Sequence, residues 1–242
     1  MRQSSFPIAI FILSFFLSKL ASPAYSQSST KDSISFSYAL KSYLPDYNRK
    51  ANYAYQNKEY KKAEKLFDSL VTHQLSGTYF DDFKFSTLRG KTIRLNNIEK
   101  PIYLITYASW CIPGKQAIPA INKIADKYGE DLQIVVLFWD SKKIARKQAK
   151  PFNKLVKVVY IDESKNQSAF EIKQLKHSFG IKTCFLLNRE KVVKRISKYP
   201  AADFSISSAE ALEANINLIE NDIQEYLLKQ PFQGIESLAN IH

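Results

Sequence analysis

The sequence predicts an α/β fold in which helices flank a central mixed sheet, with a helical hairpin before the sheet and a helix after it. Short apolar runs alternate with helical patterns between residues 77 and 200. This order is typical of crossover connections in a largely parallel sheet. Residues 188–191 form a tight turn between the last two apolar runs, which predicts an antiparallel pair at one end of the sheet.

The N-terminal residues have the three-part layout of a secretory signal. Arg2 supplies a positive start, residues 6–17 are an apolar core, and small residues follow in 21–26. The apolar core is too short to span a bilayer comfortably. We expect residues 1–26 to be a signal peptide, cleaved after Ala24 or Ser26, and the protein to be exported to the periplasm or the extracellular space. The alternative, a retained membrane anchor, is less favoured because polar residues follow at once, so no membrane span is expected after the signal is removed.

An N-terminal helical segment is expected over residues 27–76. Apolar and aromatic residues recur at intervals of three and four in residues 36–72, with a break at 57–59, and this spacing predicts two helices. The pattern resembles one tetratricopeptide unit, but no second copy follows, and a single unit cannot bury its own face. We therefore interpret the two helices as an accessory hairpin.

The main domain is expected over residues 77–200, followed by a C-terminal helix and tail over 201–242. A strand-rich lead-in covers residues 77–100 and turns at 89–91. The remaining predicted strands are 103–107, 132–139, 157–161, 183–188 and 192–196, and the predicted helices are 114–128, 144–155, 170–179 and 209–228. Ser207 or Ser208 is a natural cap for the last helix.

The composition excludes several classes of function. The chain has a net charge of +12, but its lysines are spread along the sequence, as on a solvated surface, and an exported protein is not expected to meet nucleic acid. His73, His177 and His242 lie far apart, so no metal site is predicted. No glycine-rich phosphate loop occurs among the six glycines, and no cofactor is expected.

The most informative stretch is Trp110-Cys111-Ile112-Pro113-Gly114-Lys115. It follows a predicted strand and precedes a helical pattern, so Cys111 is expected beyond the carboxyl end of the strand, where chemistry collects in such sheets. On the first turn of a helix, free backbone N–H groups and the helix dipole would favour the thiolate. A redox Cys-x-x-Cys motif would place a second cysteine at position 114, where this chain has glycine.

Residues 77–200 resemble the thioredoxin-like superfamily, in particular the exported thiol–disulfide proteins related to TlpA and ResA. The motifs that carry the resemblance are Leu88-x-Gly90-Lys91-x-Ile93-x-Leu95, Tyr107-Ala108-Ser109-Trp110-Cys111-x-Pro113, Pro119 and Phe179-Gly180-Ile181. The resemblance implies a thioredoxin-like fold with Cys111 as nucleophile. It also implies a substrate-binding surface framed by Trp110, Pro113, Ile181 and Lys182, and partners that are exported or envelope proteins with thiols or disulfides.

Three positions depart from that family. Gly114 replaces the resolving cysteine, Lys182 occupies the position of the cis-proline, and Ile105 stands where some members carry a buried acid. A cis bond before a residue other than proline costs ~3–4 kcal/mol, so we expect a trans peptide or a rebuilt loop at Lys182. A lone Cys111 thiolate can form a mixed disulfide, but its release then requires a thiol from elsewhere.

Cys184 lies two residues after Lys182 on a predicted central strand. It is either a possible second thiol that resolves or bridges Cys111, or a small buried core residue. The second interpretation is favoured, because free cysteines are commonly buried and disulfide geometry is demanding.

Two hypotheses for the function remain. The first is a monothiol thiol–disulfide oxidoreductase or isomerase that uses Cys111, and the alternative is a redox-inactive module that binds proteins or peptides. The intact Trp-Cys-x-Pro motif favours thiol chemistry. A peroxidase is not favoured, since no threonine-rich pocket precedes Cys111.

Overall fold

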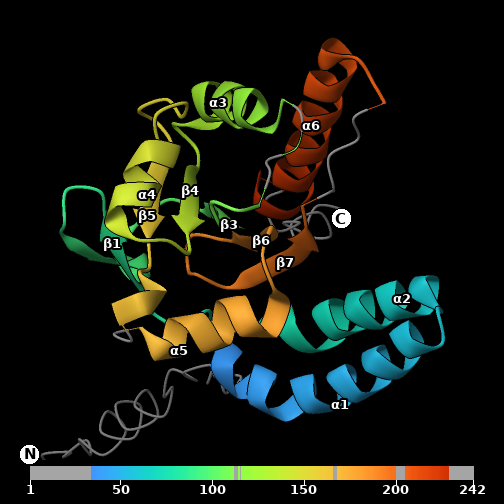
Figure 1. Cartoon of the computed structure of the whole chain (residues 1–242). Helices are drawn as coiled ribbons and strands as arrows, with labels where there is room; N and C mark the ends of the chain where they lie inside the picture. Colours follow the sequence, from blue (N-terminus) through green and yellow to red (C-terminus); the bar gives the residue numbers. More distant parts are fainter. Residues whose placement is uncertain (1–33, 112–113, 115, 166–167, 200–204, 229–242) are drawn as a thin grey trace, which may run out of the picture. The chain divides into compact units, whose positions relative to one another are not determined.

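The computed structural model describes residues 34–111, 114, 116–165, 168–199 and 205–228 (Figure 1). The predicted signal peptide, Pro113 and the tail after Leu228 lie outside the described residues. In the part of the chain that is described, no helix combines the length and the apolarity needed to cross a membrane.

The described residues form a seven-stranded mixed sheet with helices on both faces, which confirms the predicted fold class. The strand order is β2-β1-β5-β4-β3-β6-β7. The strands are β1 (Lys84–Thr87), β2 (Thr92–Arg94), β3 (Ile102–Tyr107), β4 (Gln133–Phe138), β5 (Lys157–Tyr160), β6 (Thr183–Leu187) and β7 (Val193–Lys198).

The sheet is less parallel than the alternation of strands and helices predicts. Only the pairs β3–β4 and β4–β5 are parallel, whereas β1–β2, β1–β5, β3–β6 and β6–β7 are antiparallel. The prediction of a largely parallel sheet is therefore wrong. The physical reason is the connection after β5, which brings β6 back beside β3 in the opposite direction. The antiparallel β6–β7 pair at one edge, joined by residues 188–191, is as predicted.

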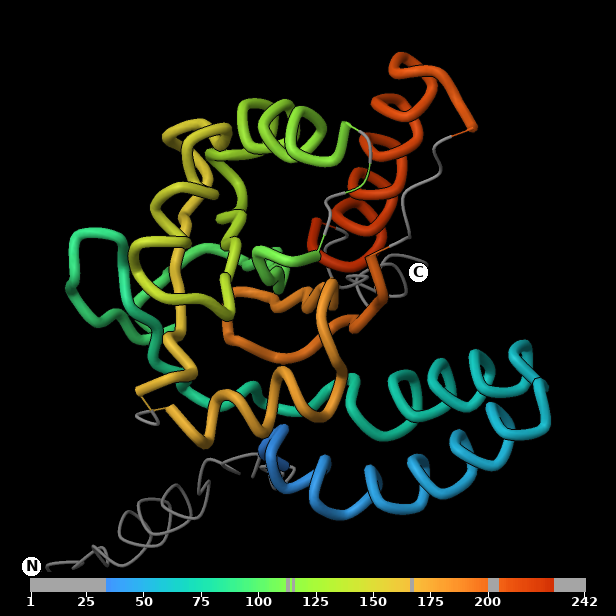
Figure 2. Tube along the Cα trace, in the orientation of Figure 1, coloured from blue at the N-terminus to red at the C-terminus, as the bar shows by residue number. Residues whose placement is uncertain are grey.

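Helices cover the two faces of the sheet in separate groups (Figures 1 and 2). The helices are α1 (Phe36–Gln56), α2 (Tyr60–Leu70), α3 (Ala117–Tyr128), α4 (Lys142–Gln148), α5 (Ala169–Glu171) and α6 (Ser208–Ile223), with π-helical segments at Val71–Leu75, Ile172–His177 and Gln224–Leu228. One face packs on α3 and α6, and the other packs on α1, the Val71–Leu75 segment and the Ile172–His177 segment. β3 lies between these layers and is buried at every residue, as expected for a strand covered on both faces.

Most helix boundaries follow the sequence signals. α1 and α2 flank the predicted break at 57–59, and Ser207 caps α6 in a capping box with Glu210, which leaves fewer unpaired N–H groups at the helix start. α4 differs from the prediction of 144–155, since it ends at Gln148. The physical reason is Pro151, because the residue before a proline disfavours the helical conformation.

Candidate functional site

The Cys111 side chain is half-buried at the carboxyl end of β3, where it packs against the core cluster that Ile181 also contacts. Its backbone N–H donates to the Ala108 carbonyl oxygen at 2.9 Å, so a tight turn follows the strand directly. This position agrees with the expectation that the cysteine lies beyond the end of a buried strand.

Cys111 is not on the first turn of a helix. The prediction that the helix begins at Gly114 is wrong, because α3 begins at Ala117. Gln116 has φ +62°, in the left-handed region, and a right-handed helix cannot continue through that conformation. The thiol therefore precedes the first turn of α3 in the chain and is not part of it.

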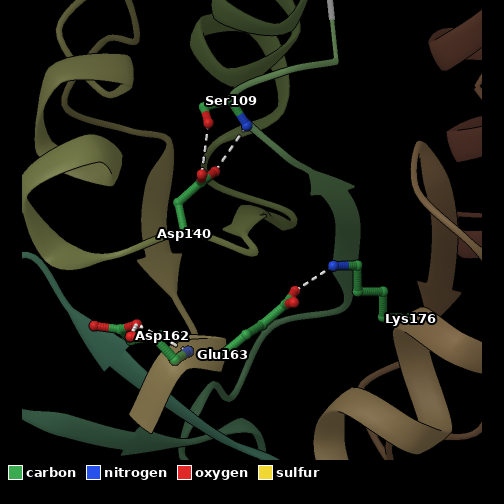
Figure 3. A network of polar contacts seen from close by, with 6 residues as sticks. Ser109, Asp140, Asp162, Glu163 and Lys176 are labelled. Carbon is green, nitrogen blue, oxygen red and sulfur yellow. Dashed lines mark hydrogen bonds and ion pairs between the residues drawn. The ribbon is translucent and has the colours of Figure 1, made fainter.

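The Cys111 turn is bound to the neighbouring strand end by Asp140, as Figure 3 shows. The Asp140 carboxylate accepts from the Ser109 backbone N–H at 2.7 Å and from the Ser109 Oγ at 2.6 Å. Just before it, the Trp139 N–H donates to the Tyr107 carbonyl oxygen at 2.9 Å. Sequence reasoning missed Asp140. The sequence signal that could have identified it is an acidic residue directly after the predicted strand 132–139, because the carboxyl ends of neighbouring parallel strands meet at one edge of the sheet.

The loop before β6 lies against the end of β3. The Lys182 N–H donates to the Thr106 carbonyl oxygen at 3.0 Å, and the Lys182 carbonyl oxygen accepts from the Tyr199 N–H at 2.7 Å. Lys182 has φ +58°, and no peptide bond among the described residues is cis. The loop therefore has a trans peptide bond and a left-handed backbone conformation at Lys182, where the related family is expected to carry a cis-proline.

Thr106 is a second residue that sequence reasoning missed. Its Oγ1 donates to the Thr183 carbonyl oxygen at 3.2 Å and accepts from the Thr183 N–H at 3.1 Å. The side chain is fully buried, and a hydroxyl inside an otherwise apolar strand was the signal, since buried polar groups need partners. Thr106 thereby holds the start of β6 beside the end of β3.

Ile181 is half-buried beside this loop and presents free backbone groups. No hydrogen bond within the described residues reaches its N–H or its carbonyl oxygen. Trp110, next to the thiol in sequence, is 69% exposed. Ile181 and Cys111 thus pack against one core cluster, and Lys182 follows Ile181 in the loop before β6. Trp110 is open to solvent. Pro113 lies outside the described residues.

Cys184 occupies a different environment. It is 1% exposed, pairs with Ile105 across the β3–β6 ladder, and belongs to the core between the sheet and α3 and α6. Burial raises the pKa of the Cys184 thiol to about 12, although the Tyr103 hydroxyl opposes the shift. Both cysteines are free thiols. The surroundings of Cys184 fit the interpretation of a core residue.

A cavity of about 30 Å³ adjoins Cys111. Its lining residues are Tyr107, Ala108, Ser109, Cys111, Ile118, Phe138, Gln148 and Phe152. The buried Tyr107 hydroxyl has no hydrogen-bond partner among the described residues, and burial is the main cause that raises its pKa. A space of this size holds a water molecule or a small group.

Comparisons with known proteins agree with this architecture. Residues 77–196 match the AhpC/TSA family. The thioredoxin-like protein YneN of Bacillus subtilis is 31% identical over 77 residues, which cover 31% of this chain and 45% of that protein, so the match spans less than half of the relative's length.

Two solved structures are also similar to this chain. The thioredoxin domain of a thiol-disulfide oxidoreductase from Bacteroides vulgatus matches with a TM-score of 0.46 and 13% identity, over 60% of this chain and 96% of that one. StoA from Bacillus subtilis matches with a TM-score of 0.37 and 20% identity, over 54% and 93%. The predicted resemblance is confirmed: residues 77–196 match the AhpC/TSA family, and part of the chain is similar to a thioredoxin-like protein.

Proposed function

We propose that this protein is an exported monothiol thiol–disulfide oxidoreductase or isomerase, with Cys111 as its nucleophile. The observation that carries the proposal is the placement of a half-buried free thiol at the end of β3, the strand end to which the Ile181–Lys182 loop is also bound. The Ile181 backbone groups have no hydrogen-bond partner among the described residues. Export rests on the signal-like layout of residues 1–26.

The reaction is a thiol–disulfide exchange. The Cys111 thiolate attacks one sulfur of a substrate disulfide, the substrate S–S bond breaks, and the second substrate sulfur leaves as a thiolate. The product is a mixed disulfide between Cys111 and the substrate. No net oxidation occurs, because one disulfide replaces another.

Release of the substrate then depends on a thiol from outside the site. Position 114 is glycine, and Cys184 is buried with a pKa raised to about 12, so its thiolate is scarce at neutral pH. A second cysteine of the substrate can attack the mixed disulfide and leave the substrate with a rearranged pairing. An external thiolate can instead attack the Cys111 sulfur of the mixed disulfide, which releases the substrate as a thiolate and leaves the external thiol bound to Cys111 as a disulfide; a second external thiol then frees Cys111. Isomerisation and monothiol exchange are therefore favoured over rapid intramolecular reduction.

The substrate surface is proposed to take an extended segment of an exported or envelope protein. The Ile181 N–H and carbonyl oxygen can pair with such a segment as a strand partner does, and the exposed Trp110 supplies apolar area beside the thiol. Pro113 and Lys182 complete the proposed frame. Lys182 already uses both of its backbone groups within the protein, so only its side chain is available to a substrate.

The test is to trap the mixed disulfide. The mature protein, Cys111→Ser and Cys184→Ser are incubated with a peptide disulfide and analysed by intact mass. We expect a covalent adduct with the wild type and with Cys184→Ser, and none with Cys111→Ser. Reaction of wild-type Cys111 no faster than that of a cysteine in an unstructured peptide would contradict the proposal.

A redox-inactive binding module is the second candidate. The observation that favours it is the start of α3 at Ala117, because Cys111 is then not part of the first helical turn that was expected to activate it. Under this alternative, Cys111→Ser binds the same peptides as the wild type, with an unchanged Kd, and no adduct forms with either protein.

A further inference from the structure

Asp140 holds the turn that carries Cys111 through a two-point contact with a single serine. Both carboxylate oxygens are engaged, one by the Ser109 N–H at 2.7 Å and the other by the Ser109 Oγ at 2.6 Å. Asp140 and Ser109 are both half-buried, and charge-assisted hydrogen bonds of this length are among the stronger ones in proteins. Only Trp110 separates this contact from Cys111.

The contact joins the carboxyl ends of two parallel strands (Figure 3). Tyr107 is paired with Phe138 in the ladder, and the Trp139 N–H extends the pairing to the Tyr107 carbonyl oxygen. Asp140 continues the connection after the ladder ends. The turn then closes with the bond from the Cys111 N–H to the Ala108 carbonyl oxygen, so Ser109 lies inside the segment whose geometry sets the position of the thiol.

We propose that Asp140 is a positioning residue for Cys111. Through Ser109 it keeps the turn in the arrangement from which the thiolate reaches a disulfide held at Ile181. This inference rests on the proposed function of Cys111. No hydrogen bond joins Asp140 to the thiol within the described residues, so Asp140 acts on the turn and not on the sulfur.

The chain supplies a matched control. Asp81 binds Ser37 in the same way, with the backbone N–H at 2.9 Å and the Oγ at 2.7 Å. The neighbouring Phe80 N–H donates to the Lys191 carbonyl oxygen at 2.8 Å, in the turn between β6 and β7. Because β6 runs antiparallel to β3, that turn lies at the end of the sheet opposite to Cys111. Asp81→Ala therefore removes the same chemistry without touching the Cys111 turn.

The experiment uses the mature full-length chain and a peptide disulfide with a chromophoric leaving group. The second-order rate constant of exchange at Cys111 is measured across pH for the wild type, Asp140→Ala, Asp140→Asn, Ser109→Ala and Asp81→Ala. Amide hydrogen exchange at Ser109, followed by NMR, reports the contact itself, and circular dichroism confirms that each variant is folded.

We expect Asp140→Ala to lower the high-pH plateau of the rate constant by about tenfold or more, since displacements of about 1 Å can cost about 10²-fold. Asp140→Asn keeps an acceptor for the Ser109 N–H and should recover part of the rate and of the amide protection, and Ser109→Ala should show a smaller loss. Asp81→Ala should react like the wild type.

Equal plateaus for Asp140→Ala and Asp81→Ala would overturn the positioning role while leaving the function of Cys111 intact. The same loss in Asp140→Asn as in Asp140→Ala, with Ser109 protection retained in Asp140→Asn, would assign the effect to charge and also overturn it. A wild-type rate no higher than that of an unstructured cysteine would instead reject the proposed function.

Discussion

The two cysteines of this chain show how position in one sheet determines the chemistry of a thiol. Cys111 lies half-buried in a turn after the end of β3, the strand end to which the loop before β6 is also bound. Cys184 lies within β6, opposite Ile105 of the same β3, and is 1% exposed. The first is accessible to a reactant at the edge of the sheet. The second is enclosed by the helices that cover one face, where desolvation penalises its charged form.

The largest expected difference is in alkylation. At pH 8 the thiolate fraction of Cys184 is on the order of 10⁻⁴, given a pKa raised to about 12 and a tenfold change per pH unit, and burial slows the reagent further. We expect native protein to take one label, at Cys111, and a second label only after addition of denaturant. Mass spectrometry of labelled peptides locates each label. Rapid labelling of Cys184 in the native protein would contradict the expected difference in reactivity between the two thiols.

The second expected difference is in alkaline stability. Below about pH 9 the Cys184 thiol is protonated in both the folded and the unfolded chain. Between about pH 9 and pH 12 the unfolded chain releases this proton while the folded chain retains it, so the free energy of unfolding falls with rising pH, by up to about 1.4 kcal/mol per unit.

Denaturant titrations at several pH values should therefore show a shallower decline for Cys184→Ala than for the wild type over this range. Thr92→Val, an exposed substitution that removes no titratable group, serves as the control and should keep the wild-type slope. A decline of Cys184→Ala in parallel with the wild type would contradict the prediction.

The third prediction concerns Lys182, which lies in the loop that is bound to the end of β3 and leads into the strand that carries Cys184. Lys182→Pro, which restores the residue that the family carries, should destabilise the fold by about 3 kcal/mol or more, because proline cannot adopt φ +58° and removes the N–H bound to Thr106. Lys182→Gly should instead stabilise it by about 1 kcal/mol, since glycine occupies the left-handed region without strain. Chemical denaturation measures both, and a stable Lys182→Pro variant would show that the loop readily reverts to the family's conformation.

The last prediction concerns the buried hydroxyl at the end of β3, whose loss should cost less than Lys182→Pro. Thr106→Val removes the Oγ1 that binds both backbone groups of Thr183 and should cost about 1–3 kcal/mol, because the Thr183 N–H is left unpaired in the core. The same substitution at the exposed Thr92 should change little. Equal stabilities for these two variants would show that the hydroxyl does not hold the start of β6.

Several features were predictable because they depend on local sequence. The break at 57–59, the cap at Ser207 and the turn before β7 each follow from residues adjacent in the chain, and all are present. The start of α3 was not predictable, because the left-handed conformation of Gln116 has no signal in its own side chain. The direction of β6 was not predictable either, since the connection that precedes it is compatible with a parallel or an antiparallel return.

The sequence by itself determined the order of strands and helices, the thioredoxin-like class, the position of Cys111 after a buried strand and the absence of a cysteine at position 114. Hydrophobic periodicity and motif spacing encode these features locally. The tertiary structure alone decided that Asp140 meets Ser109, that Thr106 holds the start of β6 and that α3 and α6 are the helices that cover Cys184. Those contacts depend on which strands become neighbours and in what register, and packing of the whole core sets both.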